Sequence, residues 1–295
     1  MRGANRYRSA RRSARLARMT LAIRPLSDVL AAEVRGVDLR EPLDDGGRAT
    51  LHEAFLERHI LCFRDQKLDK PAQLAATLQF GPLDVHIQRN KGDDISLVHT
   101  VSNLDADGNP KPEAAAKGNL RWHSDKSYRT VPSCSTFLYG VQVPARGGRT
   151  EFANMHRAFE AYSPERQEAF RGMKVVHDWV RSCQKSGERE ASAEEAAVYP
   201  PVAHPLVRRH PESGYEAFFI GNHASHIFGM DRDEGEALLE EIEAHSTAER
   251  FVYRHRWQPG DLLMWDNRCL LHRAEERAGE ARVLHRTVTR GTSPF

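Results

Sequence analysis

The sequence predicts an α+β fold in which helices flank a β-sandwich or β-barrel. From residue 133 onward, short segments typical of strands dominate, bounded by turn residues such as Gly147-Gly148 and Pro259-Gly260. Helical patterns lie mostly in the first half of the chain and in insertions between the strands. No P-loop occurs, and no glycine-rich dinucleotide motif follows a strand, so nucleotide-binding α/β folds are disfavoured.

The first elements are predicted from periodicity and from capping residues. Apolar residues spaced on one face, with acidic residues at the start, predict a helix over 44–59, which runs into a short apolar strand at 60–66. A second helix is predicted over 69–82, with Asp69 as its N-cap. Residues 90–119 are polar and rich in Gly, Pro and Asp around one short strand at 95–102. Because long loops inside compact domains often cover active sites, this loop is predicted to be a lid.

The later elements are predicted to be strands interrupted by two helices. The helices are expected at 164–173 and 233–245, and the strands at 135–143, 148–154, 215–221, 260–266 and 282–291. No repeat or low-complexity tract follows residue 20. We therefore expect one domain over 19–295.

The N-terminal residues 1–18 differ sharply in charge from the rest of the chain. They contain seven arginines and no acidic residue, so the net charge of +2 leaves about −5 for the remainder (2 − 7 = −5). We predict a disordered extension; a transit-like leader or a nucleic-acid-binding arm are the alternatives. The mildly acidic remainder gives nucleic-acid binding little support, so no nucleic-acid partner is expected.

Composition restricts the class of protein further. Hydrophobic residues make up 40% and charged residues 28%, as in ordinary globular enzymes. No apolar run approaches the roughly 18–20 residues that span a bilayer, so no membrane association is expected. The four cysteines are scattered without a CxxC pair, which argues against a disulfide framework or zinc ribbon and favours a cytoplasmic location.

The segment "LRWHSDKSYRTVP" contains a candidate metal-binding pair, His123 and Asp125. Side chains two apart on an extended chain point the same way. A mononuclear non-haem iron site needs two imidazoles and one carboxylate on one face of the metal. The candidate third ligand is His272 in "GDLLMWDNRCLLHRAEE", where an apolar strand leads to a polar patch; we expect it at a strand end.

Two arginines follow His272 in "RVLHRTVTRG". Strand alternation predicts that Arg282 and Arg286 share a face, roughly 13 Å apart along the backbone. Two guanidinium groups facing one cavity suit two separate anions, such as a dicarboxylate co-substrate and an anionic substrate. A solvated strand face is the alternative, and the position after His272 favours the binding role.

The chain resembles the Fe(II)/2-oxoglutarate-dependent dioxygenases of the taurine dioxygenase and 2,4-dichlorophenoxyacetate dioxygenase family. The resemblance spans about residues 20–290, with the aryloxyacetate branch closest. The segments that carry it include "NLRWHSDKSY", "VPARGGRTEFANM", "FFIGNHASHIFGM", "FVYRHRWQPGDLLMWDNRCLLHRA" and "RVLHR". It implies a double-stranded β-helix (jelly-roll) core with flanking helices and a long active-site lid loop. It also implies Fe(II), with 2-oxoglutarate and O2 as co-substrates, and a homo-oligomer.

The resemblance also implies roles for individual residues. The iron ligands would be His123, Asp125 and His272. Thr150 and Arg282 would bind the 2-oxoglutarate carboxylate distal to the metal, although Arg282 follows His272 by ten residues where about eleven are expected. The residues implied in substrate binding are Arg286, for the substrate's own anion, Asn119 and His223.

The reaction implied is hydroxylation of a small anionic substrate with release of succinate and CO2. An aryloxyacetate would be cleaved to a phenol and glyoxylate. Asp125 stands where related halogenases have Gly or Ala, which favours hydroxylation. The alternatives are an oxygenase of a sulfonate, sulfate ester or cinnamate-like acid, and a non-catalytic binding protein on the same scaffold.

Several other residues have simpler interpretations. The "RHPESG" segment reads as a surface turn, with His210 and Glu212 exposed. For His223 and His226, a core or supporting position is an alternative to substrate contact. The tryptophans predicted to be core residues that flank the site are Trp122, Trp257 and Trp265.

Overall fold

The structure, a computed structural model, describes residues 21–84, 97–111, 117–187, 190–275 and 279–295. The predicted extension over 1–18 lies outside the described residues. So does much of the predicted lid loop 90–119, in which the structure describes one short strand and one turn of 3-10 helix.

The largest sheet has seven strands. They are β1 (Ala22–Pro25), β2 (Ala32–Arg35), β3 (Ile60–Phe63), β4 (His99–Ser102), β5 (Ser133–Gln142), β13 (Leu262–Asp266) and β15 (Val283–Arg290). Their order across the sheet is β1-β2-β3-β13-β5-β15-β4. Only β2 and β3 pair in parallel; the other neighbours are antiparallel. The C-terminal strands thus lie between strands from the first half of the chain.

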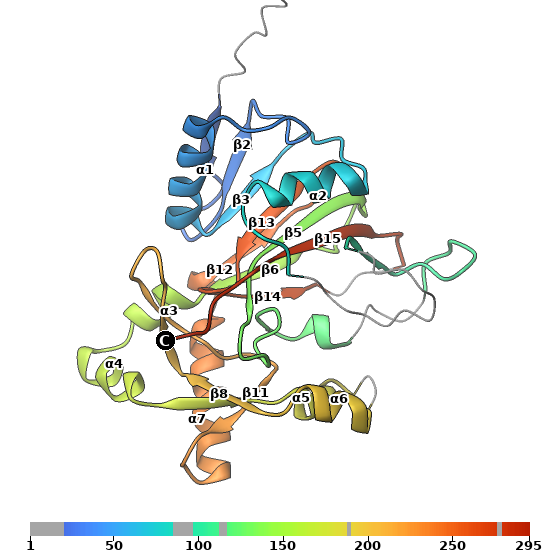
Figure 1. The fold of residues 1–295 in the computed structure, drawn as a ribbon. Helices are drawn as coiled ribbons and strands as arrows, with labels where there is room; N and C mark the ends of the chain where they lie inside the picture. The colour runs from blue at the N-terminus through green and yellow to red at the C-terminus, as the bar shows by residue number, and fades with distance from the viewer. Residues whose placement is uncertain (1–20, 85–96, 112–116, 188–189, 276–278) are drawn as a thin grey trace, which may run out of the picture.

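Two N-terminal helices cover one face of this sheet (Figure 1). Helix α1 spans Asp45–Arg58, and helix α2 spans Lys70–Leu78. The Asp69 side chain accepts a hydrogen bond from the Ala72 amide, which confirms the predicted cap. Helix α2 ends four residues before the predicted position.

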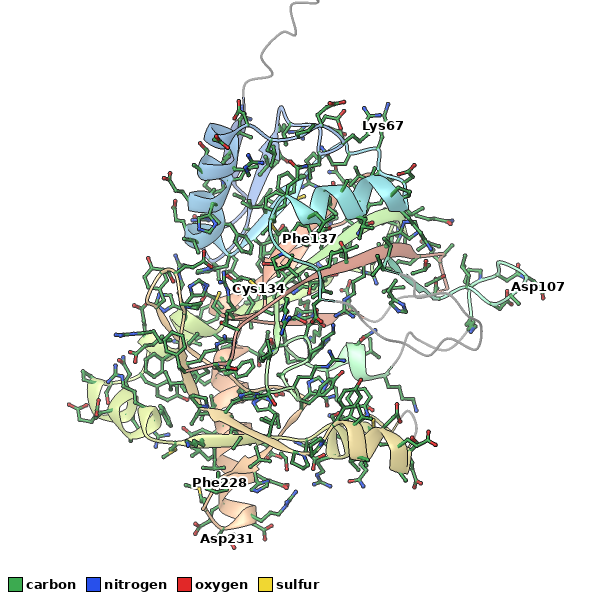
Figure 2. The ribbon with its side chains drawn as sticks, viewed as in Figure 1. Lys67, Asp107, Cys134, Phe137, Phe228 and Asp231 are labelled. Atoms are coloured by element: carbon green, nitrogen blue, oxygen red, sulfur yellow. The ribbon has the colours of Figure 1, made fainter. Side chains whose placement is uncertain are left out.

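Alternation along the strands divides the apolar side chains between two core clusters. On β13, Leu262 and Met264 pack beneath α1 and α2, whereas Leu263 and Trp265 point to the opposite face. Phe137 of β5 is fully buried in the first cluster and lies in the interior in Figure 2. Burying one such ring contributes about 1.5–3 kcal/mol. Both faces of this sheet are therefore covered.

The second face packs against a smaller antiparallel sheet of order β12-β6-β14, where β12 is Val252–His255, β6 is Thr150–Asn154 and β14 is Leu270–Ala274. The remaining strands of the described residues form two further small sheets. Their members are β7 (Lys174–His177), β8 (Val202–Pro205) and β11 (Ala224–Ile227) in one, and β9 (Val207–Arg209) and β10 (Glu216–Phe218) in the other.

The remaining helices gather around these smaller sheets, at the end of the molecule away from α1 and α2 (Figure 1). They are α3 (Met155–Glu160), α4 (Pro164–Arg171), α5 (Trp179–Ser186), α6 (Ala193–Val198) and α7 (Arg232–Ser246), with 3-10 turns η1 (Lys117–Leu120) and η2 (Glu249–Phe251). Helices α4 and α7 match the two predicted ones. Within the described ranges, no helix is long and apolar enough to cross a membrane.

The predicted strands are confirmed with shifted ends as β3, β4, β5, β6, β10, β13 and β15. Several strands of three to five residues were not predicted, including β7, β8, β12 and β14. Segments this short carry little periodicity, and their partners are distant in sequence. The consequence for the site is that His272 lies on β14, a strand that the sequence did not predict.

Candidate functional site

A backbone bridge between two distant segments brings the two candidate histidines together. The amide of His123 donates to the carbonyl of His272 at 3.0 Å, and the amide of His272 donates to the carbonyl of His123 at 2.8 Å. His272 lies at the centre of β14, so its predicted position at a strand end was wrong. The middle of a paired strand holds a side chain more firmly than a strand end does.

Asp125 joins these histidines, and one donor atom from each of the three residues lies within 4.8 Å of the others. His272 Nε2 is 3.9 Å from Asp125 Oδ1. A close backbone approach supports this geometry, because a Cβ at Gly221 would lie 3.0 Å from the Trp122 carbonyl oxygen. Gly221 also has φ +117°, which favours glycine.

Both imidazoles are held in the neutral form that can bind a metal. His123 Nδ1 donates to the Arg121 carbonyl oxygen at 2.7 Å, since a carbonyl can only accept, and this leaves the Nε2 lone pair free. Burial lowers the pKa of His123. Burial lowers the pKa of His272 well below its ordinary value. Neutral imidazole nitrogen is the ligand that transition metals require.

Asp125 supplies the negative charge of the site. Burial acts to raise the pKa of its carboxyl, but the positive charge of the neighbouring Arg286 opposes burial, and the pKa lies below its usual range. Arg286 Nη2 lies 2.6 Å from Asp125 Oδ1. Two neutral nitrogens and one carboxylate oxygen are the donor set of non-haem iron(II) sites, so the residues present fit that metal.

Thr150 lies on the same side of its sheet as His272. In the antiparallel pairing of β14 with β6, His272 is opposite Phe152, and Thr150 is two residues from Phe152. Directly opposed residues share a face, as do residues two apart along a strand. The outward residue Glu151 instead binds Arg254 and Arg273, each through Nε at 2.6 Å.

The Thr150 hydroxyl is oriented by two donors. Trp257 Nε1 donates to Thr150 Oγ1 at 3.0 Å, and Arg282 Nη2 donates to the same oxygen at 3.3 Å. Because the oxygen accepts both, the hydroxyl proton is directed elsewhere. Trp257 is therefore part of this site and not only a core residue. Gly148, at φ +64°, lets the Pro144 ring pack against its backbone, since a Cβ at position 148 would lie 2.7 Å from that ring.

Arg282 and Arg286 reach different parts of the site, but not through simple alternation. Arg282 precedes β15, which begins at Val283, and a β-bulge follows between Val283 and Leu284. Arg282 extends to Thr150, whereas Arg286 extends to Asp125. The prediction of two separately placed guanidinium groups therefore agrees with the structure, although its geometric argument was incomplete.

A chain of hydrogen bonds determines which ring nitrogen of His223 carries the proton. His177 Nε2 donates to the Phe219 carbonyl at 3.3 Å, so its Nδ1 accepts from the Ser127 hydroxyl at 3.1 Å. Ser127 Oγ then accepts from His223 Nδ1 at 3.1 Å. Burial lowers the pKa of His177 well below its ordinary value and that of His223 to about 3, so both are neutral. His223 Nε2 is consequently an acceptor.

Asn119 and Lys126, which lie near His123 and Asp125 in sequence, differ in whether their side chains have a partner. Asn119 is half-buried in η1, and no hydrogen bond of its side chain to another described residue is found. Lys126 has φ +56° and a buried side chain whose Nζ lies 2.7 Å from Asp84 Oδ2. The ammonium group of Lys126 is therefore paired with the Asp84 carboxylate.

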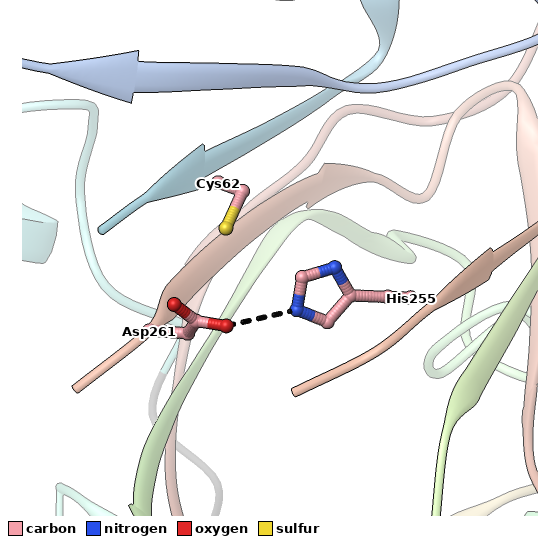
Figure 3. A group of neighbouring side chains, drawn as sticks. All are labelled: Cys62, His255 and Asp261. Carbon is pink, nitrogen blue, oxygen red and sulfur yellow. Dashed lines mark hydrogen bonds and ion pairs between the residues drawn. The ribbon is translucent and has the colours of Figure 1, made fainter. Parts of the chain in front are cut away.

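A second group of donor atoms, from Cys62, His255 and Asp261, also lies within 4.8 Å (Figure 3). Here Asp261 Oδ2 is 3.2 Å from His255 Nε2, 2.8 Å from the Gln258 amide and 2.6 Å from Arg64 Nη1. Burial, and then Asp261, raise the pKa of the Cys62 thiol, so it stays protonated. The cation of this group is the Arg64 guanidinium.

The structure also corrects one interpretation and adds two residues. His210, expected at the surface, is buried and bonds Asp266 Oδ2 at 3.0 Å; Glu212 is exposed as predicted. Sequence reasoning missed Thr136 and Asn267, which surround Asp125. A polar residue on the inner face of an otherwise apolar strand was the available signal for Thr136.

The chain is similar to known proteins over most of its length. The model of the family "Taurine catabolism dioxygenase TauD, TfdA family" matches residues 22–288. The alpha-ketoglutarate-dependent 2,4-dichlorophenoxyacetate dioxygenase of Cupriavidus pinatubonensis (strain JMP 134) is 36% identical over 280 residues, covering 92% of this chain and 98% of that one. The (S)-phenoxypropionate/alpha-ketoglutarate-dioxygenase of Delftia acidovorans is also 36% identical, covering 87% and 90%.

Solved structures agree with these relatives. The crystal structure of AAD-2 in complex with Mn(II) and N-oxalylglycine superimposes with a TM-score of 0.80 at 33% identity, covering 94% of this chain and 99% of that one. The match therefore extends over the sheets and helices that build the site as well as over the sequence. The chain belongs to the taurine catabolism dioxygenase TauD, TfdA family.

Proposed function

We propose that this protein is an Fe(II)- and 2-oxoglutarate-dependent dioxygenase that hydroxylates a small anionic substrate, most favourably an aryloxyacetate. The observation that carries this proposal is the convergence of His123, Asp125 and His272, with one donor atom from each within 4.8 Å. Membership of the family and the names of the relatives, which act on phenoxy acids, support it.

In this proposal the protein residues bind and orient, and the metal does the oxidation. His123, Asp125 and His272 would hold the iron. Bound iron(II) supplies the chemistry that couples oxidation of 2-oxoglutarate by O2, to succinate and CO2, with insertion of one oxygen atom into a substrate C–H bond. The Thr150 hydroxyl, oriented by Trp257, and the Arg282 guanidinium would bind the carboxylate of 2-oxoglutarate distal to the metal.

Arg286 would bind the anionic group of the substrate beside the metal. Its reach to Asp125 supports this role, because the target carbon must lie next to the iron. Asn119 and His223 are proposed to contact the remainder of the substrate. His223 would do so through its ring and an acceptor nitrogen, not through a positive charge.

Aromatic side chains around His223 favour an aryl substrate. The ring centroid of Tyr128 lies 4.8 Å from that of His223 and 4.6 Å from that of Trp179. Such rings stack with an aryl group and offer little to a short alkyl chain. With an aryloxyacetate, O2 and 2-oxoglutarate, hydroxylation beside the ether oxygen gives a hemiacetal, succinate and CO2. The hemiacetal then separates into a phenol and glyoxylate.

The runner-up is oxidation of a different anion, such as a sulfonate, a sulfate ester or a cinnamate-like acid. A guanidinium group binds a carboxylate or a sulfonate equally well, so Arg286 does not discriminate between them. A non-catalytic binding protein is disfavoured, because Thr150, Arg282 and all three candidate ligands are present.

The test is succinate formation from 2-oxoglutarate by the iron-loaded protein with a panel of substrates. We expect turnover to be fastest with aryloxyacetates and 2-aryloxypropionates, with equimolar phenol. Faster turnover of taurine or an alkyl sulfate would favour the runner-up. No succinate above the substrate-free rate with any anion would contradict an oxygenase role.

The finer features of the fold also belong to this proposal. The opposed sheets β12-β6-β14 and β1-β2-β3-β13-β5-β15-β4 would form the double-stranded β-helix (jelly-roll) core, with the loop 90–119 as its lid. A single domain over 19–295, a cytoplasmic location and a homo-oligomer remain predictions. So does the disordered extension at 1–18.

A further inference from the structure

We propose that Thr136 and Asn267 are positioning residues that make Asp125 a one-oxygen ligand of the metal. This inference rests on the proposed function, because it concerns the same iron site. Thr136 lies on the inner face of β5, and Asn267 directly follows β13. Neither residue was assigned a role from the sequence.

The two residues bind one oxygen of the Asp125 carboxylate through a directed chain. Thr136 Oγ1 lies 2.5 Å from Asp125 Oδ2, and Asn267 Nδ2 lies 2.9 Å from Thr136 Oγ1. An amide NH2 group can only donate, so the threonine oxygen accepts from it. The single hydroxyl proton of Thr136 is therefore donated to Asp125.

The orientation of the Asn267 amide is itself fixed. Trp265 Nε1 lies 3.1 Å from Asn267 Oδ1, and an indole N–H is only a donor. The carbonyl end of the amide must face Trp265, so the NH2 end must face Thr136. The Asp125 backbone amide is a second donor to Asn267 Oδ1, at 3.4 Å.

Burial makes this chain costly to break. Trp265, Asn267, Thr136 and Asp125 are each at most 7% exposed. The Ser124 hydroxyl also donates to the backbone carbonyl of Asn267 at 2.8 Å. Inside a protein, an unpaired polar group loses its solvation without compensation. Consequently, every donor has an acceptor only when the hydrogen bonds are donated in one direction along the chain, from Trp265 through Asn267 and Thr136 to Asp125.

The consequence concerns which oxygen binds iron. Oδ2 is engaged by Thr136, whereas Oδ1 lies 3.9 Å from His272 Nε2 and is paired with Arg286 Nη2 at 2.6 Å, a partner that the metal would replace. Binding through Oδ1 alone would give the metal three protein ligands and would leave its other positions to the co-substrates. A carboxylate that bound through both oxygens would take one of those positions from the co-substrates. Outer partners of metal ligands commonly have this orienting function.

The test is titration of the metal-free protein with Co(II), without 2-oxoglutarate, followed by the visible absorption of the bound metal. We expect Thr136→Val to weaken Co(II) binding about 10- to 100-fold and to change the absorption bands, because the carboxylate is free to rotate. Thr136→Ser, which keeps the hydroxyl, should restore both.

A matched control removes a different buried hydroxyl. Thr77 Oγ1 lies 2.6 Å from Thr287 Oγ1 and does not touch Asp125. Thr77→Val should therefore leave Co(II) affinity and absorption unchanged. An equal loss of affinity in Thr77→Val and Thr136→Val would overturn the inference, because the effect would be general destabilisation.

His272→Ala separates this inference from the proposed function. If His272→Ala loses Co(II) binding while Thr136→Val binds like the wild type, the positioning inference fails and the metal site stands. If His272→Ala binds Co(II) as tightly as the wild type, the proposed metal site fails, and the inference fails with it.

Discussion

The His123–Asp125–His272 triad and the Cys62–His255–Asp261 cluster each bring three donor atoms within 4.8 Å of one another. They differ in what already occupies those atoms. In the cluster, both ring nitrogens of His255 have a hydrogen bond. The Arg64 guanidinium binds Asp261 and is held in place by a second ion pair, with Glu33 at 3.0 Å. Both nitrogens of His255 and the Oδ2 atom of Asp261 are therefore already used.

In the triad, each imidazole keeps a ring nitrogen without a hydrogen-bond partner among the described residues. His123 uses only Nδ1 in a hydrogen bond to backbone, whereas Asp125 has Oδ2 held by Thr136 and Oδ1 paired with Arg286 Nη2 at 2.6 Å. Its arginine partner, Arg286, is 22% exposed at the side chain, against 9% for Arg64. Proximity of donor atoms is thus insufficient to identify a metal site. The hydrogen bonds around each donor decide whether a cation can be bound or is already present.

Removing a ligand of the triad should have the largest effect. Asp125→Ala deletes one of three proposed donors, so Co(II) affinity should fall by more than the roughly 10- to 100-fold that loss of an outer partner costs. Substrate-dependent CO2 release from labelled 2-oxoglutarate should stop. Undiminished turnover in this variant would contradict the ligand assignment.

Removing the internal cation of the second cluster should affect stability and not metal binding. Arg64→Met leaves Asp261 buried without its charge partner, and we expect the free energy of unfolding to fall by about 3–5 kcal/mol in urea denaturation. Arg35→Met, which removes an exposed arginine bound to the same Glu33, is the control and should cost much less. A stable Arg64→Met protein would show that the cluster does not depend on its cation.

The arginine at the triad should matter for substrate and not for folding. Arg286→Gln removes a charged hydrogen-bond donor, so the KM of the anionic substrate should rise about 10- to 100-fold while that of 2-oxoglutarate changes little. Arg282→Gln should give the opposite pattern. If the two patterns were exchanged in steady-state kinetics, the two arginines would have been assigned to the wrong anions.

The smallest effect is expected at Cys62. The thiol is fully buried and protonated, so Cys62→Ala should leave the Co(II) stoichiometry at one per chain and the affinity unchanged. Metal titration of the purified variant checks this. A wild-type stoichiometry of two that drops to one in Cys62→Ala would identify the cluster as a second metal site.

Local sequence patterns predicted the elements whose signals are local. Helix caps, apolar runs and the turn residues that bound them depend on neighbouring residues, and α1, α2, β5 and β13 were predicted from them. His210 was assigned to the surface, since nothing local indicated that Asp266, 56 residues away, would bind it in the interior. Short strands such as β14 were missed for a similar reason, because their pairing partners supply most of their stability.

The sequence by itself determined the donor types, their order and the family, because these depend on which residues are present and at what spacing. Only the tertiary structure decided which donors meet: the bridge between His123 and His272, the chain from Trp265 to Asp125, and the contrast between Arg64 and Arg286. The physical reason is that hydrogen-bond direction and burial are properties of packed neighbours. Those neighbours come from strands that lie more than a hundred residues apart in the chain.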